Sequence, residues 1–491
     1  MRILYNITGV PCALRTREKE PEMVFSSLIF LFAYLPVTLL CYYALPRRCR
    51  NTALFLLSLL FYGWGEPIYL LLMVASITTA YLFGFPISRF RESNRKKARV
   101  YTAISVAVNL SFLFFFKYYH FFAENFSRLP FVDLPKIPGL TLPIGISFYT
   151  FQIISYTVDL YRGDCSLQQN YISFGTYVTL FPQLIAGPIV RYHDIDGQLA
   201  ERRETVADFS GGVARFCAGL AKKVLIGDVM AAGYEYYRSI AELSPSTLGA
   251  WMTVILFTLH LYYDFSGYSD MAIGLGLMLG FHFPENFNYP YIAKSITEFW
   301  RRWHISLSTW FREYVYIPLG GNRRGRARQY WNLFVVWFLT GFWHGADWNF
   351  ILWGLYFCVI LICEKAFLLR RLQALPSLLQ HAYTLLLVGI GFLIFSHSDL
   401  QAAWRCFQAM LGIGVTSAAT PAARYQLKTL LPLLLIATVG ATPIPRRLWH
   451  ALQARAPRAS LLYPVATAIA LLLCTAYLVD STFSPFAYTQ F

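Results

Sequence analysis

The stretch between Pro284 and Gly321 is rich in side chains that can carry charge or bind it. If it is helical, four polar side chains share one side of the helix: Arg301, His304, Ser308 and Arg312. Arginine matches phosphate with paired hydrogen bonds, so this side, with the adjacent Arg302, would form a cationic doorway for a phosphate-bearing donor such as an acyl-coenzyme A. A helix that anchors the protein in the membrane interface through snorkelling arginines fits the same pattern. The residues alone leave both interpretations open.

A second candidate is His344, which lies in the sequence Thr340–Trp348 between two apolar runs. A histidine inside a membrane segment usually faces the protein interior or water, and imidazole can act as a base near neutral pH. Gly341 and Gly345 would let a substrate approach closely. Asp347 would lie one helical turn from His344, if the backbone is helical there, and would orient its ring. A structural histidine that caps a tight turn explains the pattern equally well.

The elements that must hold these residues are hydrophobic. The chain of 491 residues is 56% hydrophobic and 14% charged, whereas a soluble domain is about 45–50% apolar and about 25% charged. One large membrane domain is therefore predicted. Short basic clusters between apolar runs carry the net charge of +16, which argues against nucleic acid binding. The nine cysteines form no CxxC pair, so neither a disulfide framework nor a structural metal site is indicated.

Apolar runs recur along the whole chain, and a spanning helix needs about 20 mainly apolar residues. The candidates are 24–45, 67–85, 100–122, 142–161, 211–232, 248–263, 330–342, 350–369, 378–395, 427–441 and 461–479. Shorter pieces broken by Gly and Pro are 52–62, 171–185 and 271–281. Irregular backbone at membrane depth must be buried in protein or line a wet cavity. The prediction is an all-α, polytopic integral membrane protein with roughly 11 to 14 transmembrane or re-entrant helices.

Basic loops predict the orientation of these helices. The clusters at 47–50, 89–99, 323–328, 370–371 and 446–458 should be cytoplasmic, which places both termini outside the cytoplasm. Residues 1–22 are polar and form an N-terminal extension ahead of the membrane domain of residues 23–491. Since Met23 opens the first apolar helix directly, it is an alternative start to Met1.

Other polar residues lie inside apolar runs and are expected to pair with one another within the protein: Asp159, Lys222, Lys223, His260, Asp264 and Asp270. The chain contains neither a P-loop nor a GxSxG elbow nor a zincin motif. Nucleotide hydrolysis and a serine-hydrolase triad therefore have no support.

Seven sequence pieces together resemble the membrane-bound O-acyltransferase superfamily, in its alginate O-acetyltransferase branch, which includes peptidoglycan O-acetyltransferases. They are FLLSLLFYGWGEPIYLLLM, LPIGISFYTFQIISYTVDLYRG, TLFPQLIAGPIVRY, YYDFSGYSDMAIGLGLMLGF, ENFNYPYIAKSITEFWRRWHISLSTWFREYVYIPLGG, LTGFWHGADWNFILWGLYF and the terminal SPFAYTQF. Each piece alone is weak, but their order along nearly the whole chain from Met23 is specific. The last five residues are less aromatic than is usual in this branch.

The resemblance implies that His344 is the signature histidine and His304 the second recurrent one. It implies a ring of helices around a central tunnel, with a funnel from each membrane face. A cytoplasmic donor, expected to be acetyl-coenzyme A, would pass Arg301, Arg302 and Arg312 and present its thioester to an acceptor hydroxyl activated by His344. No bound cofactor is implied. The acyl group would move outward to an SGNH-type extracytoplasmic acyltransferase and then to an exported polysaccharide such as alginate, cellulose or peptidoglycan.

The same resemblance predicts a multi-pass protein of a bacterial cell membrane, surrounded by lipid. Two other functions fit part of the pattern. A D-alanyl transferase of teichoic acid modification would use a carrier-protein thioester. A transporter also has broken helices and intramembrane charges, but it predicts two halves of similar pattern, and the sequence shows no such repeat.

Overall fold

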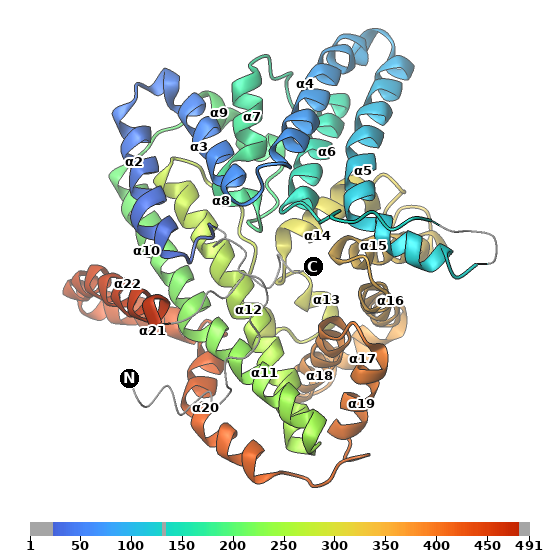
Figure 1. Cartoon of the computed structure of the whole chain (residues 1–491), viewed down its shortest axis with the longest axis vertical. Helices are drawn as coiled ribbons and strands as arrows, with labels where there is room; N and C mark the ends of the chain where they lie inside the picture. Colours follow the sequence, from blue (N-terminus) through green and yellow to red (C-terminus); the bar gives the residue numbers. More distant parts are fainter. Residues whose placement is uncertain (1–22, 130–133, 481–491) are drawn as a thin grey trace.

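Helices are the only regular elements in the described part of the chain, residues 23–129 and 134–480 of a computed structural model (Figure 1). The all-α prediction is confirmed there. The possible extension 1–22 and the terminal SPFAYTQF motif lie outside the described residues. The α-helices are α2 (Leu35–Ala44), α3 (Arg50–Gly65), α4 (Leu70–Ser93), α5 (Arg95–Phe126), α6 (Ile146–Arg162), α7 (Tyr171–Thr179), α8 (Phe181–Leu184), α9 (Tyr192–Ala200), α10 (Val206–Ala221), α11 (Asp228–Leu243), α12 (Thr247–Met278), α13 (Ile296–Phe299), α14 (Ile305–Phe311), α15 (Arg326–His344), α16 (Trp348–Cys363), α17 (Leu369–Gln373), α18 (Ser377–Ser396), α19 (Leu400–Met410), α20 (Pro421–Gly440), α21 (Ile444–Arg455) and α22 (Leu462–Asp480).

Five segments among the described residues are long and apolar enough to cross a membrane. They are Leu70–Ser93, Arg95–Phe126, Trp348–Gln373, Ser377–Ser396 and Arg458–Asp480; α20 and α21 would add a sixth if that pair, bent by 69°, is one span. The other long helices fall short because they are broken or carry polar residues. The chain is thus a multi-pass membrane protein by composition and length, and the larger number of crossings stays a prediction.

α12 forms the centre of the molecule and is almost entirely buried (Figure 1). The sequence suggested two pieces here, 248–263 and 271–281, but α12 runs unbroken from Thr247 to Met278, so that division was wrong. Its glycines do not interrupt the helix because they admit the backbone of α10: a Cβ on Gly274 would lie 2.6 Å from the carbonyl oxygen of Gly212. Small residues let two membrane helices approach this closely.

Ion pairs join α10, α12 and the π-helical turn Lys222–Gly227 between α10 and α11. Lys222 donates to Asp270 at 2.6 Å, and Asp270 also pairs with Arg215 at 2.9 Å. Lys223 lies 3.7 Å from Asp264. His260 bonds through Nδ1 to the Gly227 carbonyl oxygen at 3.0 Å, and His193 bonds to Asp159 at 2.7 Å. The expectation that these buried groups pair internally is confirmed.

The connection from α12 to α15 contains little regular structure, although it lies in the middle of the ribbon (Figure 1). The single amphipathic helix expected here is wrong, because the helix ends at Phe299 and restarts at Ile305. The buried Glu364 carboxylate fixes the first piece, since it accepts hydrogen bonds from the backbone N–H groups of Ile296 and Thr297, each at 2.8 Å. These hydrogen bonds position the arginine and histidine residues that follow.

Candidate active site at two histidines

His344 is the last residue of α15 and is 5% exposed. Its ring meets the edges of three aromatic rings, with centroid distances of 5.0 Å to Trp343, 4.8 Å to Trp353 and 5.4 Å to Phe395. The helix ends here because Gly345 adopts an extended conformation. The imidazole is therefore set by packing inside an aromatic pocket that excludes water.

The residues that flank His344 differ from expectation. Gly341 and Gly345 admit the next helix rather than a substrate, since a Cβ on Gly341 would lie 2.4 Å from the Phe350 carbonyl oxygen and one on Gly345 would overlap the Phe350 ring at 2.2 Å. The helical turn that would bring Asp347 beneath His344 is absent. The Asp347 carboxylate instead accepts from the backbone N–H of Trp348 at 2.7 Å and caps α16.

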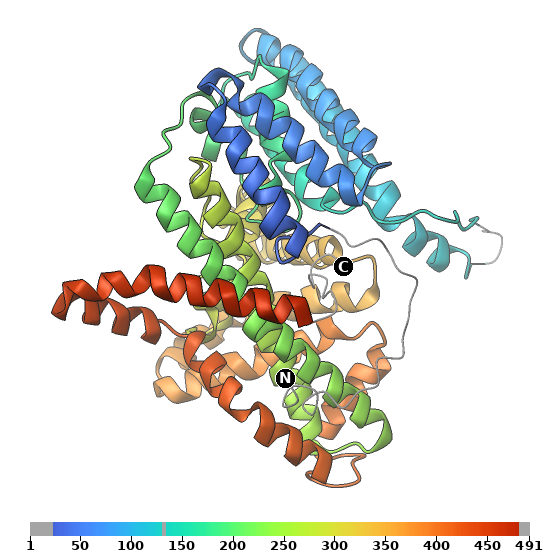
Figure 2. The ribbon, with the colours of Figure 1, turned by 60° about the vertical axis from the view of Figure 1, so that its left-hand side comes forward.

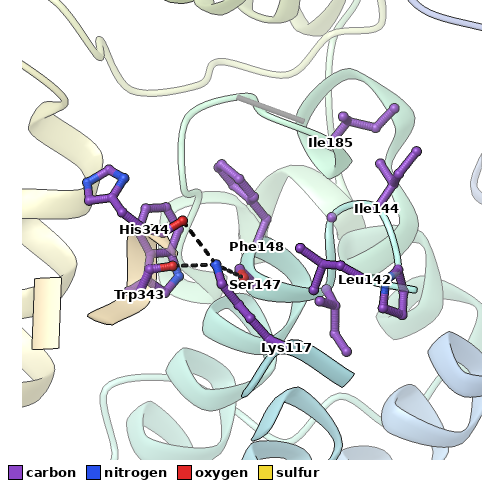
Figure 3. Close-up of a pocket in the computed structure, with 11 residues that line it drawn as sticks. Lys117, Leu142, Ile144, Ser147, Phe148, Ile185, Trp343 and His344 are labelled. Carbon is purple, nitrogen blue, oxygen red and sulfur yellow. Dashed lines mark hydrogen bonds between the residues drawn. The ribbon is translucent and has the colours of Figure 1, made fainter. Parts of the chain in front are cut away.

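Lys117 on α5 holds the backbone beneath His344 (Figure 3). Its ammonium donates to the carbonyl oxygens of Trp343 at 2.5 Å and His344 at 3.3 Å, and to Ser147 Oγ at 3.4 Å. A cation at the C-terminus of a helix stabilises it because the last carbonyls lack helical partners. The imidazole points away from Lys117 in Figure 3, so the lysine acts on the backbone rather than on the ring. Sequence analysis missed it, although one lysine in an apolar run is a signal of function.

His304 has a different support. It is 1% exposed, and its φ of 45° is one of two positive values at non-glycine residues in the described part of the chain. Such a backbone is strained and persists where its surroundings fix it. Asn286 does so: its carbonyl accepts from the backbone N–H of Ile305 at 3.0 Å, and its side-chain Oδ1 lies 3.1 Å from His304 Nδ1.

The Asn286 contacts also assign the protons of the His304 ring. Oδ1 of Asn286 accepts from the backbone N–H of Ser306 at 3.3 Å, while its Nδ2 donates to Ser269 at 3.0 Å, which fixes the amide orientation. His304 must therefore carry its proton on Nδ1, leaving Nε2 as the proton acceptor. His304 lies outside the candidate spans, and burial lowers its pKa to about 3, so the ring is neutral at pH 7.

The structure brings the two histidines together at Trp343, whose ring contacts both. The Trp343 ring centroid lies 6.1 Å from that of His304 and 5.0 Å from that of His344. The indole N–H groups of Trp300, Trp343 and Trp353 are buried and have no hydrogen-bond partner among the described residues. Buried donors without partners are rare, and in a dry site they can donate to a carbonyl oxygen that becomes negative during reaction.

A cationic hollow of about 210 Å³ leads to His304. The four side chains predicted to share one side all line it: Arg301, His304, Ser308 and Arg312. That spatial prediction is confirmed despite the break in the helix. Lys365 also lines the hollow and was missed by sequence analysis, since it lies at the end of a long apolar run next to Glu364. The same hollow is also lined by the aromatic side chains of Trp300, Phe311 and Trp337.

Arg302 is placed differently from Arg301. Its guanidinium bonds to Glu298, with Nε 2.9 Å and Nη2 2.8 Å from Oε1, and it also donates to the Asn288 carbonyl oxygen. It does not line the hollow at His304. The expected cationic doorway therefore contains Arg301 and Arg312, whereas Arg302 lies beside it in an ion pair.

A second, smaller pocket of about 40 Å³ has His344 in its lining, with the imidazole pointing away from Lys117 (Figure 3). Lys117, Ser147 and Trp343 line it together with the backbone that leads into α6. The predicted topology assigns this side to the outside and the arginine-lined hollow to the cytoplasm. The two histidines thus lie between two openings, an arrangement that suits a group transferred from one side to the other.

Comparison with known proteins agrees with this geometry. Residues 59–397, which hold both histidines, match the membrane-bound O-acyltransferase family. A Pseudomonas aeruginosa protein named Probable alginate O-acetylase AlgI is 45% identical over 80% of this chain and 75% of its own length. A Helicobacter pylori peptidoglycan O-acetyltransferase is 35% identical over 80% of this chain and 81% of its own length. A Bacillus subtilis teichoic acid D-alanyltransferase is 31% identical over 52% of this chain and 68% of its own length. The chain is an acyltransferase that belongs to the membrane-bound O-acyltransferase family.

Proposed function

We propose that this protein transfers an acetyl group from cytoplasmic acetyl-coenzyme A toward an exported polysaccharide such as alginate, cellulose or peptidoglycan. The observation that carries the proposal is the histidine pair: His304 lines the arginine-rich hollow and His344 lines the smaller pocket. A phosphate-bearing donor suits the first opening because Arg301, Arg312 and Lys365 surround it. An acceptor with a hydroxyl group suits the second.

In the proposed reaction His344 is the general base. The acceptor hydroxyl oxygen attacks the thioester carbonyl carbon while His344 takes the hydroxyl proton. The C–S bond then breaks, and the proton passes to the departing thiolate. His304, neutral and held by Asn286, orients or binds the donor through its Nε2 side. The buried indole N–H groups can stabilise the developing oxyanion.

The wider architecture follows from the same proposal. Roughly 11 to 14 transmembrane or re-entrant helices would surround a central tunnel in a bacterial cell membrane, with the short helices α13 and α14 inside the ring. Residues 23–491 would form one acyltransferase domain. An SGNH-type extracytoplasmic acyltransferase would receive the acetyl group and complete its transfer to sugar.

The relatives favour acetyl over D-alanyl transfer. Proteins named for alginate O-acetylation match about four-fifths of this chain at 43–45% identity, whereas a teichoic acid D-alanyltransferase matches about half of it at 31%. These names support an exported polysaccharide as the final acceptor and an acetyl group as the cargo. The proposal that coenzyme A is the donor rests on the arginine-lined hollow.

Deletion and complementation in the bacterium that carries this chain test the proposal. The acetyl ester content of the exported polysaccharide, measured by NMR, should fall to background on deletion and return with the full-length protein. Inverted membrane vesicles supplied with acetyl-coenzyme A labelled in the acetyl group should export label only when the protein is present. Unchanged acetylation on deletion, or loss of D-alanyl esters instead, would refute the assignment.

A further inference from the structure

Basic side chains of α21 line a hollow at the cytoplasmic side of the predicted topology. This hollow has a volume of about 430 Å³, and its polar walls include Arg302, Arg446, Arg447 and His450. α21 lies after residue 397, beyond the part of the chain that matches the acyltransferase family. The hollow therefore adds a feature that the family match does not describe.

Three hollows adjoin one another between α21 and His304. The α21 hollow shares Asn288 and Arg302 with a second one of about 470 Å³, and the second shares Thr297 and Arg301 with the hollow that reaches His304. A series of neighbouring hollows, each sharing two lining residues with the next, thus leads from Arg446 and Arg447 to the candidate catalytic centre. A long ligand could lie along it with one end at each extreme.

The charge along this series of hollows is mostly uncompensated. In residues 23–129 and 134–480 no carboxylate forms an ion pair with Arg301, Arg446 or Arg447, whereas Arg302 is paired with Glu298. Unpaired guanidinium groups that line a hollow fit phosphate oxygens, because the planar fork matches them with two hydrogen bonds. The unpaired arginines lie at the two ends of the series, which fits two separate phosphate positions.

The geometry of α21 turns these arginines toward the hollow. α21 turns away from α20 (orange to red in Figure 2) at a bend of 69° and carries three exposed apolar residues at helical spacing: Ile444, Leu448 and Leu452. This apolar stripe suits contact with lipid. Arg446, Arg447 and His450 project from the rest of the helix surface and line the hollow. The helix thus separates a lipid face from a polar face.

We infer that the α21 hollow is a phosphate subsite that holds the nucleotide end of the donor, while the acyl end reaches His304. The inference rests on the proposed function and specifies it. Coenzyme A carries phosphate on its ribose, remote from the thioester, and a carrier-protein phosphopantetheine lacks that group. The subsite would make the protein prefer coenzyme A over donors that lack the remote phosphate. Anionic lipid head groups carry the same phosphate chemistry, so the test must separate the two sources.

Binding measurements on the full-length protein in nanodiscs test the inference. Wild-type protein in phosphatidylcholine should bind coenzyme A about 5-fold more tightly than dephospho-coenzyme A, which lacks only the ribose phosphate, because exposed charge pairs contribute about 1 kcal/mol. The double variant Arg446→Gln/Arg447→Gln should lose this preference while its affinity for dephospho-coenzyme A stays unchanged. Arg455→Gln is the matched control, since this exposed arginine of the same helix lines none of the three hollows.

Each other outcome overturns the inference. The hollow is not a phosphate subsite if wild type binds the two ligands equally or shows no measurable binding of coenzyme A. The same conclusion follows if the double variant keeps the preference. A double variant that keeps the preference in phosphatidylcholine and differs from wild type only in its melting temperature in phosphatidylglycerol nanodiscs would assign the arginines to lipid. Polysaccharide acetylation in cells is measured in parallel: if it persists while the preference is absent, the subsite fails and the acetyltransferase function stands.

Discussion

The two histidines of the site are held in opposite ways. At His344 the backbone is fixed, because Lys117 binds the last carbonyls of α15, while the ring is packed among aromatic edges. At His304 the ring is fixed by Asn286, and the backbone takes a left-handed conformation that few residues adopt. One histidine is therefore positioned by its helix and the other by a hydrogen bond to its imidazole.

This difference separates their roles. A general base needs a ring nitrogen that can take a proton at the reacting atom. His304 uses Nδ1 to bind Asn286, which suits a residue that orients or binds the donor. His344 lies beside the smaller pocket and next to the partnerless indole N–H groups of Trp343 and Trp353. The proposed mechanism therefore gives proton transfer to His344 and donor positioning to His304, and replacement of each histidine tests it.

The largest expected effect comes from replacing the histidine assigned to proton transfer. His344→Ala should lower polysaccharide acetylation by about 10² to 10⁴-fold, the usual contribution of a general base. His304→Ala should retain part of the activity, since it removes positioning rather than the base. Acetyl content and the melting temperature of detergent-solubilised protein should be measured on the same preparations.

Stability separates catalysis from structure in this experiment. If His344 were only structural, its loss would mainly lower the melting temperature, because removing a ring packed against Trp343, Trp353 and Phe395 leaves a cavity. Normal acetylation by a stably expressed His344→Ala protein would remove His344 from the mechanism. A deeper loss for His304→Ala than for His344→Ala would reverse the assignment.

A smaller effect is expected at Lys117, which holds the backbone at His344 through hydrogen bonds. Lys117→Met keeps the length of the side chain but leaves the Trp343 and His344 carbonyls without their donor. The rate at saturating donor should fall by about 10 to 100-fold, as for a slight misplacement of a catalytic group, while KM for the donor stays the same. Lys117→Arg should restore part of the rate because it keeps the charge.

Lys136 offers a matched control for Lys117. It is exposed and pairs with Glu124 at the surface, so Lys136→Met should leave the rate unchanged. If Lys117→Met raised KM with an unchanged rate, the lysine would bind substrate instead of positioning His344. If it kept both constants and only lowered the melting temperature, its role would be purely structural.

The sequence predicted the helical class, the two histidines and the side chains that share the hollow. It could predict the shared side because the spacing of Arg301, His304, Ser308 and Arg312 survives in space even though the helix breaks. The break itself depends on Asn286, which lies 18 residues before His304, and a contact of that kind is invisible to helical periodicity. The role expected for Asp347 depended on a helical turn after His344, but α15 ends at His344, three residues before Asp347.

The described residues contain fewer uniformly apolar segments than the number of crossings predicted, for a related reason. Apolar runs reveal helices that face lipid, but a helix surrounded by protein can carry charges that its neighbours neutralise. α12 contains Asp264 and Asp270, both paired with lysines, and it falls outside the uniformly apolar segments. Lys117 was missed for the opposite reason, because a single lysine does not change the apolar character of the run that contains it.

The smallest expected effect separates two adjacent arginines, Arg301 in the cationic doorway and Arg302 beside it. Arg301 lines the hollow at His304 without an ion pair in the described part of the chain, whereas Arg302 is paired with Glu298 and lies outside that hollow. Arg301→Gln should raise KM for acetyl-coenzyme A about 3 to 10-fold with little change in the maximal rate, and added salt should lower donor affinity less steeply than in wild type. Arg302→Gln should leave KM nearly unchanged, because Glu298 already neutralises the charge of Arg302. Loss of this ion pair should lower the stability of the protein instead. Initial rates across donor concentrations at two ionic strengths measure both constants.

Equal effects of the two substitutions would mean that the doorway acts through its total charge. An unchanged KM in Arg301→Gln with reduced membrane stability would make this arginine an interfacial anchor.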